Sequence, residues 1–571
     1  MSSATIDRAT VHARAGEFER ARELCEAALR DDPADPEALH LLGALALAQG
    51  DPGKAAEQIQ QAIAIDGQVP KYFNNLGNAL RALGRRAQAR SAYQRAVALD
   101  PGLDDAHFNL AALLQAEGDH EQALRAYRRA LEINPGLAEA HKAVGEILSA
   151  RGEYGAAADA LHEAGRLDGR YRALVPRLAV DLENSNRLEA AQEVTERGLA
   201  VDPGHPLLRL TAARLARRAG RLDAALARLQ GLTLEGTTPE VAAAIHHERG
   251  LIQDRRGDPA AAYACFLEAN RIQAGTFPER GVSKAAYLEV VDNWARTFAP
   301  SATAAWAPLA AETSHPAPVF IVGFPRSGTT LLDQILDSHP RLKTVEERPL
   351  VNELLARAQS LPGPPDLARK LAALDGTQIE HLRGAYLEAA SHHVTLKQGE
   401  VLVDKFPLNI IRVPLIWRIF PEARFILALR HPCDVCVSCF MHLFNSNDAM
   451  ANFTTLDDTT ALYQRVMGLW LRYTGQLPGL DSMPVRYEDV VGDLEGEARR
   501  LLDFLGVGWS DSVLRFYEHA RRRAHIKTPS YHQVTRPIYR EAMDRWRRYT
   551  DPLTPYLERL RPFAEAFGYR L

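Results

Sequence analysis

The hydrophobic pattern in the first half of the chain repeats every 34 residues. Alanine recurs at this interval, at Ala21, Ala55, Ala89, Ala123, Ala157, Ala191 and Ala225. A turn position keeps the same register, at Gly16, Gly50, Gly84, Gly118, Gly152, Asn186 and Gly220. A third series comprises Asp32, Asp66, Asp100, Asn134, Asp168 and Asp202. Because Gly ends helices and Asp or Asn caps the next one, each unit predicts a helix, a turn and a second helix.

This pattern resembles the tetratricopeptide repeat, including Leu76-Gly77 and the spacing Ala89-x3-Tyr93-x2-Ala96. The resemblance covers residues 7–272, as about seven units and an eighth near 241–272. It implies an all-α superhelix with a concave groove that suits an extended peptide. Candidate side chains for clamping a peptide backbone are Asn74, Asn75, Asn78 and Asn109. A structural arm, a homodimer surface and a solvated helix face remain alternatives.

Residues 318–571 alternate short apolar runs with helical patterns. The strand-like runs are Val319–Val322, Leu342–Val345, Val401–Val403, Arg424–Leu429 and Pro484–Val485. The helical patterns include Ala385–Leu396, Pro432–Phe444 and Leu462–Leu477. This alternation predicts an α/β domain, a parallel sheet with helices on both faces. Ligands of such sheets bind at the carboxyl ends of the strands, so we expect 323–330, Glu346–Glu347, Asp404–Lys405 and Arg430 to converge. Residues 273–317 predict a helix and a linker.

Composition excludes several functional classes. A chain of 571 residues predicts about two to four domains. The net charge of −4 argues against nucleic-acid binding, and five cysteines indicate no disulfide scaffold. The N-terminal residues lack the apolar stretch of a signal peptide, and no run of 18 apolar residues predicts a membrane span. We therefore expect a cytoplasmic protein without membrane partners.

The stretch Pro318–Ser338 has the layout of a phosphate-binding loop: an apolar strand, a glycine turn and a helix. Gly323 and Gly328 have the Walker A spacing, and Thr330 takes the Ser/Thr position. Thr329, however, stands where the lysine of a nucleoside-triphosphate site belongs, and the positive charge has moved to Arg326. A loop with arginine and without that lysine suits a less charged donor, such as a 5′-phosphosulfate.

These residues resemble the sulfotransferases that use 3′-phosphoadenosine 5′-phosphosulfate (PAPS), most closely the tyrosylprotein sulfotransferase branch and its bacterial relatives. The resemblance runs from Pro318 to Leu571. It rests on the segments FPRSGTTLL, DSHPRLKTVEERP, VDKFPLN, RFILALRHPCDVCVSCF, PVRYEDV and HQVTRPIYREAMDRWRRY. It implies PAPS as the co-substrate, transfer to an acceptor hydroxyl, and no metal.

The resemblance also implies a role for individual residues. Glu347 corresponds to the general base, Lys405 stabilises the leaving bridging oxygen, and Arg326 contacts the 5′-phosphate and the sulfuryl group. The remaining cofactor contacts are Ser327, Gly328, Thr329 and Thr330 in the loop, Arg430 and Ser438 at the 3′-phosphate, and Tyr487 and Arg536.

Several alternatives remain open at this point. Rivals to Glu347 as the base are Glu346, His339, His431 and His442. Cys433, Cys436 and Cys439 have a metal-like spacing, but they also fit buried positions of one helix. The arginines at 521–523 and 545–548 form either an anion-binding rim or a solvated face.

The acceptor is also open. Arg348 stands one position earlier than in the tyrosylprotein branch, which puts an acidic tyrosine substrate in doubt. A polypeptide tyrosine recruited by the repeats is our expectation, with a small molecule or glycan as the runner-up. A P-loop kinase or NTPase and a non-catalytic repeat scaffold are alternatives of other classes.

Overall fold

The computed structural model describes residues 2–151, 153–304, 306, 317–522 and 543–571. The chain divides into two compact units, Met1–Thr211 and Ala212–Leu571. The domain boundaries predicted at residues 272 and 317 stay predictions.

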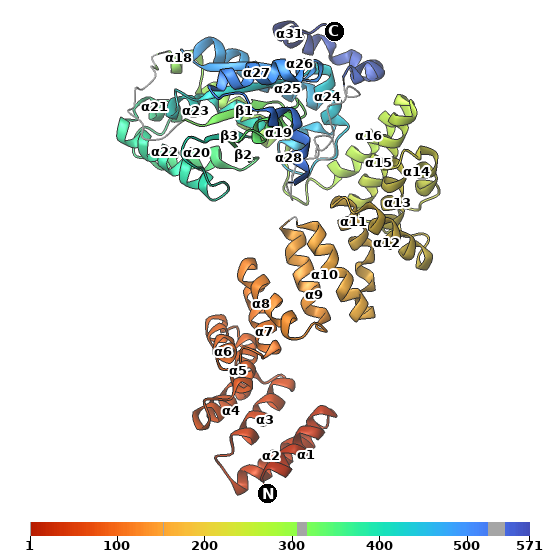
Figure 1. Cartoon of the computed structure of the whole chain (residues 1–571), viewed down its shortest axis with the longest axis vertical. Helices are drawn as coiled ribbons and strands as arrows, with labels where there is room; N and C mark the ends of the chain where they lie inside the picture. The colour runs from red at the N-terminus through yellow and green to blue at the C-terminus, as the bar shows by residue number, and fades with distance from the viewer. Residues whose placement is uncertain (1, 152, 305, 307–316, 523–542) are drawn as a thin grey trace. The chain divides into compact units, whose positions relative to one another are not determined.

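The first unit is built of consecutive helix pairs (Figure 1). Its helices are α1 (Ser2–Arg14), α2 (Phe18–Asp31), α3 (Pro36–Ala48), α4 (Pro52–Ile65), α5 (Pro70–Ala82), α6 (Arg86–Leu99), α7 (Asp104–Ala116), α8 (His120–Ile133), α9 (Ala138–Ala150), α10 (Tyr154–Leu167), η1 (Gly169–Leu174), α11 (Val175–Asn184) and α12 (Leu188–Val201). The turn between the helices of a pair is left-handed, with φ of 83° at Gly50, 73° at Gly84 and 61° at Asn186. The predicted helical repeat is therefore confirmed.

Small residues allow the two helices of a pair to approach closely. In the third pair, a Cβ added at Gly77 of α5 would overlap the Tyr93 ring of α6. The buried Tyr93 donates its hydroxyl hydrogen bond to Asn78 Oδ1 at 2.7 Å. The core of this unit is therefore a series of small contact points between neighbouring helices rather than one large interior.

The second unit begins with the end of α13 (Pro206–Arg218). It continues with α14 (Leu222–Leu229), α15 (Pro239–Arg256), α16 (Pro259–Gly275), α17 (Lys284–Thr297) and α18 (Pro300–Thr303). Helices α15 and α16 form a helix pair over the residues predicted as the eighth and last repeat, and Gly257 between them has a left-handed φ of 81°. The helix predicted after residue 272 corresponds to α17.

A parallel sheet forms the centre of the second unit. Its strands are β1 (Val319–Gly323), β2 (Leu342–Glu346), β3 (Val401–Lys405), β4 (Arg424–Leu429) and β5 (Asp481–Arg486). Within the described residues these five strands pair in the order β2-β3-β1-β4-β5, and all pairs are parallel. Phe320 and Val322 point into the core on one face, whereas Val319 and Ile321 point into the core on the other.

Helices cover both faces of this sheet (Figure 1). They are α19 (Thr329–Asp337), α20 (Leu350–Ser360), α21 (Leu367–Ala372), α22 (Gly376–Ser391), η2 (Pro407–Arg412), α23 (Val413–Ile419), α24 (Pro432–Phe440), η3 (Met450–Phe453), α25 (Leu456–Gln476), α26 (Tyr487–Gly492), α27 (Leu494–Leu505), η4 (Asp511–Arg515), α28 (Phe516–Arg522), η5 (Arg545–Tyr549), α30 (Thr550–Leu553), η6 (Thr554–Tyr556) and α31 (Leu557–Ala566). The parallel α/β prediction is confirmed.

Two helices end earlier than predicted. Helix α22 stops at Ser391 rather than near 396, and the chain turns at Gly399 (φ 80°) into β3. Helix α24 stops at Phe440 rather than 444, because side chains of the last repeat bond the carbonyls there. Asn270 Nδ2 donates to Phe440 O at 2.9 Å.

The last repeat packs tightly against the sheet domain within the second unit. His247 Nε2 lies 3.0 Å from Met441 O, and Tyr263 stacks on Phe440 with ring centroids 5.0 Å apart. The buried Asp254 of α15 accepts the Tyr549 hydroxyl at 2.7 Å and pairs with Arg545 and Arg548. These contacts fix α15 and α16 to the end of α24 and to η5.

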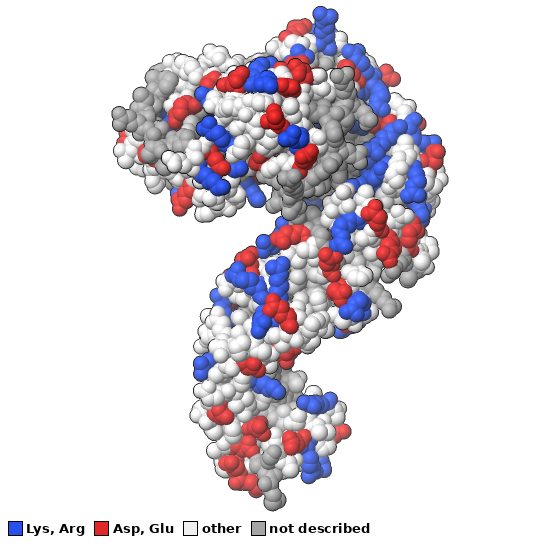
Figure 2. All heavy atoms as spheres, in the orientation of Figure 1, with Lys and Arg blue, Asp and Glu red and all other residues white. Residues whose placement is uncertain are grey.

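The surface shows no single-sign charge field on the face in Figure 2, where Lys and Arg lie interspersed with Asp and Glu over the parts that the structure describes. Over the same described ranges, no helix is long and apolar enough to cross a bilayer.

We expect Gly77→Ala to destabilise the first unit by about 1–3 kcal/mol, because the new methyl group must displace the Tyr93 ring. Urea unfolding followed by circular dichroism measures this change. Gly165→Ala in α10 is the control, since its Cβ would meet only Tyr171 O at 3.8 Å. Replacing glycine in that helix should be neutral or stabilise by up to about 1 kcal/mol. Equal stability of the two variants would contradict the packing described.

Candidate active site

The loop between β1 and α19 contains a left-handed glycine and a strained arginine. Gly328 has φ of 97°, and its Cα faces Tyr487 so closely that a Cβ would lie 3.0 Å from Tyr487 Cδ2. Arg326 has φ of 69°, a conformation that is costly for a residue with a side chain. Ser327 is only 3% exposed, and its Oγ has no hydrogen-bond partner within the described part of the chain. A buried hydroxyl beside a helix N-terminus fits an anionic ligand.

Basic side chains from two distant segments meet at this loop. Arg326 Nε donates to Ser438 Oγ at 3.2 Å, and Arg430 Nη1 lies 3.5 Å from the carbonyl oxygen of Arg326. The Arg430 guanidinium also lies over the Tyr487 ring, 5.2 Å from its centroid. The residues predicted for the 5′-phosphosulfate and the 3′-phosphate are therefore in direct contact.

A buried carboxylate positions Arg430. Asp434 Oδ2, in the first turn of α24, lies 3.9 Å from Arg430 Nη2. Asp434 also accepts the backbone N–H groups of Asp544 at 2.9 Å and Trp546 at 2.8 Å. Burial raises the pKa of Asp434, whereas Arg430 and the Trp546 hydrogen bond favour its charged form.

The second centre of the site is Lys405 at the end of β3. Its Nζ lies 3.0 Å from Glu346 Oε1 and 2.8 Å from Glu347 Oε1, and its side chain is fully buried. Burial lowers the pKa of Lys405, but Glu346, Glu347 and Asp333 outweigh burial and raise it. Lys405 is therefore an ammonium at neutral pH.

The two glutamates differ in access. The Glu346 side chain is 11% exposed, whereas that of Glu347 is 47% exposed. Glu347 also has a left-handed φ of 47°, held by its N–H, which donates to Lys405 O at 2.8 Å. Only Glu347 of this pair combines contact with Lys405 and an open approach for a second substrate.

Lys405 and the loop lie at the same edge of the sheet. Ile321 of β1 pairs in register with Lys405, and Glu346 pairs with Lys405 from the other side. Gly323 pairs with Ala428, two residues before Arg430. The predicted convergence at the carboxyl ends of β2, β3, β1 and β4 agrees with this register.

The three rival histidines are engaged in the fold. His431 Nε2 lies 2.9 Å from Arg570 O, and its Nδ1 accepts the Cys433 N–H at 3.3 Å. His339 Nε2 lies 2.8 Å from Gly508 O, and its Nδ1 accepts the Arg341 N–H. Burial and nearby Arg326 hold the pKa of His442 well below its usual range. His339 and His431 thus use both ring nitrogens in hydrogen bonds within the domain.

The three cysteines and the arginine clusters were the remaining candidates from the sequence. Cys433, Cys436 and Cys439 are buried, and burial raises the pKa of each thiol. No group of three potential metal ligands occurs among the residues that the structure describes. Arg545 and Arg548 pair with Asp254 rather than forming an open rim. The side chains of residues 521–523 and all of Arg536 lie outside the described residues.

Sequence reasoning missed the residues that support this site. Asp434 follows Arg430 by four positions at a helix start, a spacing that could have indicated the pair. Asp333 is a fully buried acid in the middle of α19. Tyr386 was also missed: its hydroxyl donates at 2.7 Å to Asp404, which was predicted at the same edge as Lys405 and is buried there. No pattern in the sequence pairs Tyr386 with Asp404.

The fold defines an α/β domain whose candidate site lies at the carboxyl ends of parallel strands. Residues 318–511 match the model of the sulfotransferase family, and tetratricopeptide-repeat models match 6–70, 77–118, 104–137 and 182–246. The chain thus joins segments that match tetratricopeptide repeats to a segment that matches the sulfotransferase family.

Curated relatives and solved structures also resemble parts of the chain. An uncharacterized protein of Aquifex aeolicus (strain VF5) is 26% identical over 418 residues, 70% of this chain and 52% of the relative. Protein-tyrosine sulfotransferase 1 of Danio rerio is 29% identical over 237 residues, 40% of this chain and 65% of the relative. The chain thus spans less than two thirds of either relative. The crystal structure of MamA is 25% identical with a TM-score of 0.26, covering 28% of this chain and 95% of MamA.

The buried Asp404 predicts a pH dependence of stability. Burial raises its pKa to about 7, although the Tyr386 hydrogen bond and Lys405 favour the charged form. Since the unfolded pKa is about 3.9, the folded state binds the extra proton between these values. Its contribution to the free energy of unfolding is therefore present at low pH and lost as pH rises to about 7, by at most about 1.4 kcal/mol per unit.

Asp404→Asn keeps an acceptor for Tyr386 and should remove this dependence, so that the variant gains stability relative to the wild type at pH 8 but not at pH 4. Tryptophan fluorescence during urea unfolding reports on the second unit, because all six tryptophans lie in it. Asp503→Asn, at an exposed position of α27, is the control. An unchanged pH dependence in Asp404→Asn would contradict the assignment.

Proposed function

We propose that this protein transfers the sulfuryl group of PAPS to an acceptor hydroxyl, with Glu347 as the base. The observation that carries the proposal is the 2.8 Å contact between Lys405 Nζ and Glu347 Oε1 at the strand ends beside the glycine loop. The sulfotransferase-family match over 318–511 supports the reaction class. Thr329 at the Walker lysine position disfavours a kinase or NTPase.

The reaction is an in-line transfer that needs no redox partner. The acceptor O–H gives its proton to Glu347 while its oxygen forms a new bond to sulfur. The bond between sulfur and the bridging oxygen of the donor breaks, and its electron pair leaves on 3′-phosphoadenosine 5′-phosphate. Lys405 and Arg326 stabilise the negative charge that develops on that leaving group. Because Lys405 already holds a proton, it acts as a fixed positive charge.

We assign the residues that bind PAPS from the anion-binding features of the loop and of α24. The buried Ser327 hydroxyl and the first turn of α19 at Thr329 and Thr330 suit the 5′-phosphosulfate, together with Gly328. Arg430 and Ser438 suit the 3′-phosphate, and Tyr487 closes the loop from above Gly328. The contact between Arg326 and Ser438 supports one continuous donor site. Arg536 remains a proposed contact from the resemblance alone.

The acceptor that we favour is a tyrosine of a polypeptide recruited by the repeats. The protein-tyrosine sulfotransferases among the relatives support this choice, as does the array of helix pairs. Transfer of label from PAPS into a cell lysate, separated into protein and small-molecule fractions, tests it. We expect the label in tyrosine sulfate of the protein fraction. Label confined to small molecules or glycans would contradict a polypeptide acceptor.

Glu347→Gln should lower kcat by about 10²–10⁴-fold while PAPS binding is kept, because the proton acceptor is lost. Glu346→Gln is the matched control, since it removes the other carboxylate at Lys405 but not the exposed one. Its kcat should fall less, by about tenfold or below. Single-turnover transfer and donor titration measure the two effects separately. Full activity of Glu347→Gln would show that the base is another group.

Ser438→Ala should weaken binding of 3′-phosphoadenosine 5′-phosphate by about tenfold, because a hydrogen bond to a charged phosphate contributes about 1.5 kcal/mol. Binding of adenosine 5′-monophosphate should not change, since it lacks the 3′-phosphate. Ser391→Ala, an exposed helix serine, is the control. Isothermal titration of both nucleotides checks the assignment, and an equal loss for both would overturn it.

A further inference from the structure

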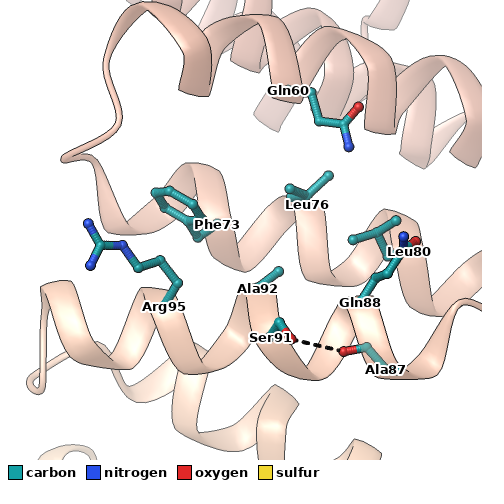
Figure 3. A pocket seen from close by; sticks show the side chains of 9 residues that line it. All are labelled: Gln60, Phe73, Leu76, Leu80, Ala87, Gln88, Ser91, Ala92 and Arg95. Atoms are coloured by element: carbon teal, nitrogen blue, oxygen red, sulfur yellow. Dashed lines mark hydrogen bonds between the residues drawn. The ribbon is translucent and has the colours of Figure 1, made fainter.

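A cleft on the third helix pair of the first unit has no role in the reaction proposed above. It has a volume of about 460 Å³ and lies among α4, α5 and α6 (Figure 3). Its lining comprises Gln60, Phe73, Leu76, Leu80, Ala87, Gln88, Ser91, Ala92 and Arg95. Apolar side chains of α5 form one wall, and the Arg95 guanidinium lies 5.8 Å from the centroid of Phe73. The cleft thus combines an apolar floor with a cation at one end.

The charged side chains of the helix pair that carries this cleft are all basic. Between residues 67 and 99 the sequence contains no Asp or Glu, and its basic residues are Lys71, Arg81, Arg85, Arg86, Arg90 and Arg95. Arg90 pairs with Glu117 of the next repeat. No ion pair involves Arg95 within the described part of the chain, and Arg95 is exposed. A strongly positive repeat in a chain of net charge −4 favours an acidic partner.

The next repeat has different side chains at the positions that line the cleft. Positions one period later hold Glu121 and Arg125, where the cleft has Ala87 and Ser91. Glu121 and Arg125 pair with each other at 3.2 Å. The equivalent of Arg95 is Arg129, which is bound by Glu132 at 2.9 Å. The third repeat therefore has small side chains and an uncompensated cation where its neighbour has ion pairs.

The asparagines predicted to clamp a peptide do not provide this site. Asn109 Nδ2 donates to Asn74 Oδ1 at 3.0 Å, and Asn75 Nδ2 lies 2.7 Å from His40 Nε2. Asn78 accepts the Tyr93 hydroxyl. Each of these amides already has a partner within the array, so a peptide must compete with those contacts. The cleft offers apolar surface and charge without such competition.

We propose that the cleft binds an acidic polypeptide segment through one apolar side chain, leucine or phenylalanine, seated against Phe73, Leu76 and Leu80. Carboxylates beside that side chain pair with Arg95 and with the other arginines of the same repeat. This assignment deepens the recruitment of a polypeptide acceptor and rests on that proposed function.

The test is fluorescence anisotropy of the full-length protein with a labelled decapeptide of Asp and Glu around one phenylalanine. Saturable binding is expected, with at least tenfold weaker binding when phenylalanine is replaced by serine or when the acids are replaced by Gln and Asn. A single-stranded oligonucleotide of equal charge should bind at least tenfold more weakly. Equal binding of the oligonucleotide or of the serine peptide would overturn the proposal.

Ala87→Glu is the most informative variant, because Glu121 occupies the same place in the next repeat. It lies in the first turn of α6, where an acidic side chain favours the helix, so the fold should be kept. It should weaken peptide binding at least tenfold, and Arg95→Gln about threefold or more. Arg129→Gln is the matched control and should leave binding within twofold. Wild-type affinity in Ala87→Glu would overturn the proposal.

Binding is measured without PAPS, so the two proposals can fail separately. Loss of sulfuryl transfer with intact peptide binding would contradict the proposed reaction alone. Transfer to tyrosine peptides with no saturable binding of the acidic decapeptide would contradict the docking site alone.

Discussion

The buried ammonium of Lys405 between two carboxylates is the interaction on which the site geometry depends. Placing a charge in the interior is costly, and Glu346 and Glu347 offset that cost through contacts of 3.0 and 2.8 Å. An ammonium left in the interior with no partner typically costs about 3–5 kcal/mol, and two carboxylates guard Lys405 against that loss. The ion pairs thus bind the ends of β2 and β3 together. They also direct the Glu347 side chain toward the edge where the loop after β1 lies.

A second set of contacts connects the donor loop to the last repeat. Arg326 bonds Ser438 near the end of α24, and the carbonyl groups of Phe440 and Met441 accept bonds from Asn270 and His247. Only one residue, Cys439, separates Ser438 from the first of these carbonyls. Helices α15 and α16 therefore support the helix that carries the proposed 3′-phosphate contact. The final repeat is part of the architecture of the sheet domain as well as the end of the array.

Much of this fold follows from local sequence. The 34-residue period gave the helix pairs, and the apolar runs gave β1 and β4 nearly to the residue, because buried parallel strands read as continuous apolar sequence. The predicted ends of α22 and α24 were wrong. At α24 the cause is tertiary, since Asn270 and His247 bond the carbonyl groups of Phe440 and Met441. The alternation of strands and helices also predicted which segments meet at the carboxyl edge of the sheet. It could not predict the Arg326–Ser438 contact or the place of Asp434, because these depend on side chains packed across the fold.

Strained backbone conformations concentrate around the candidate site. The described residues contain four non-glycine residues with positive φ: Asn186, Arg326, Glu347 and Asp544. Three of them surround the candidate site, and each is held by another residue there. The Glu347 N–H bonds Lys405, Arg326 bonds Ser438, and the Asp544 N–H bonds Asp434. Such conformations cost about 1–3 kcal/mol each and persist only where neighbours enforce them. The charged groups are thus set in place by the fold itself, which is how preorganised sites stabilise developing charge without reorganisation.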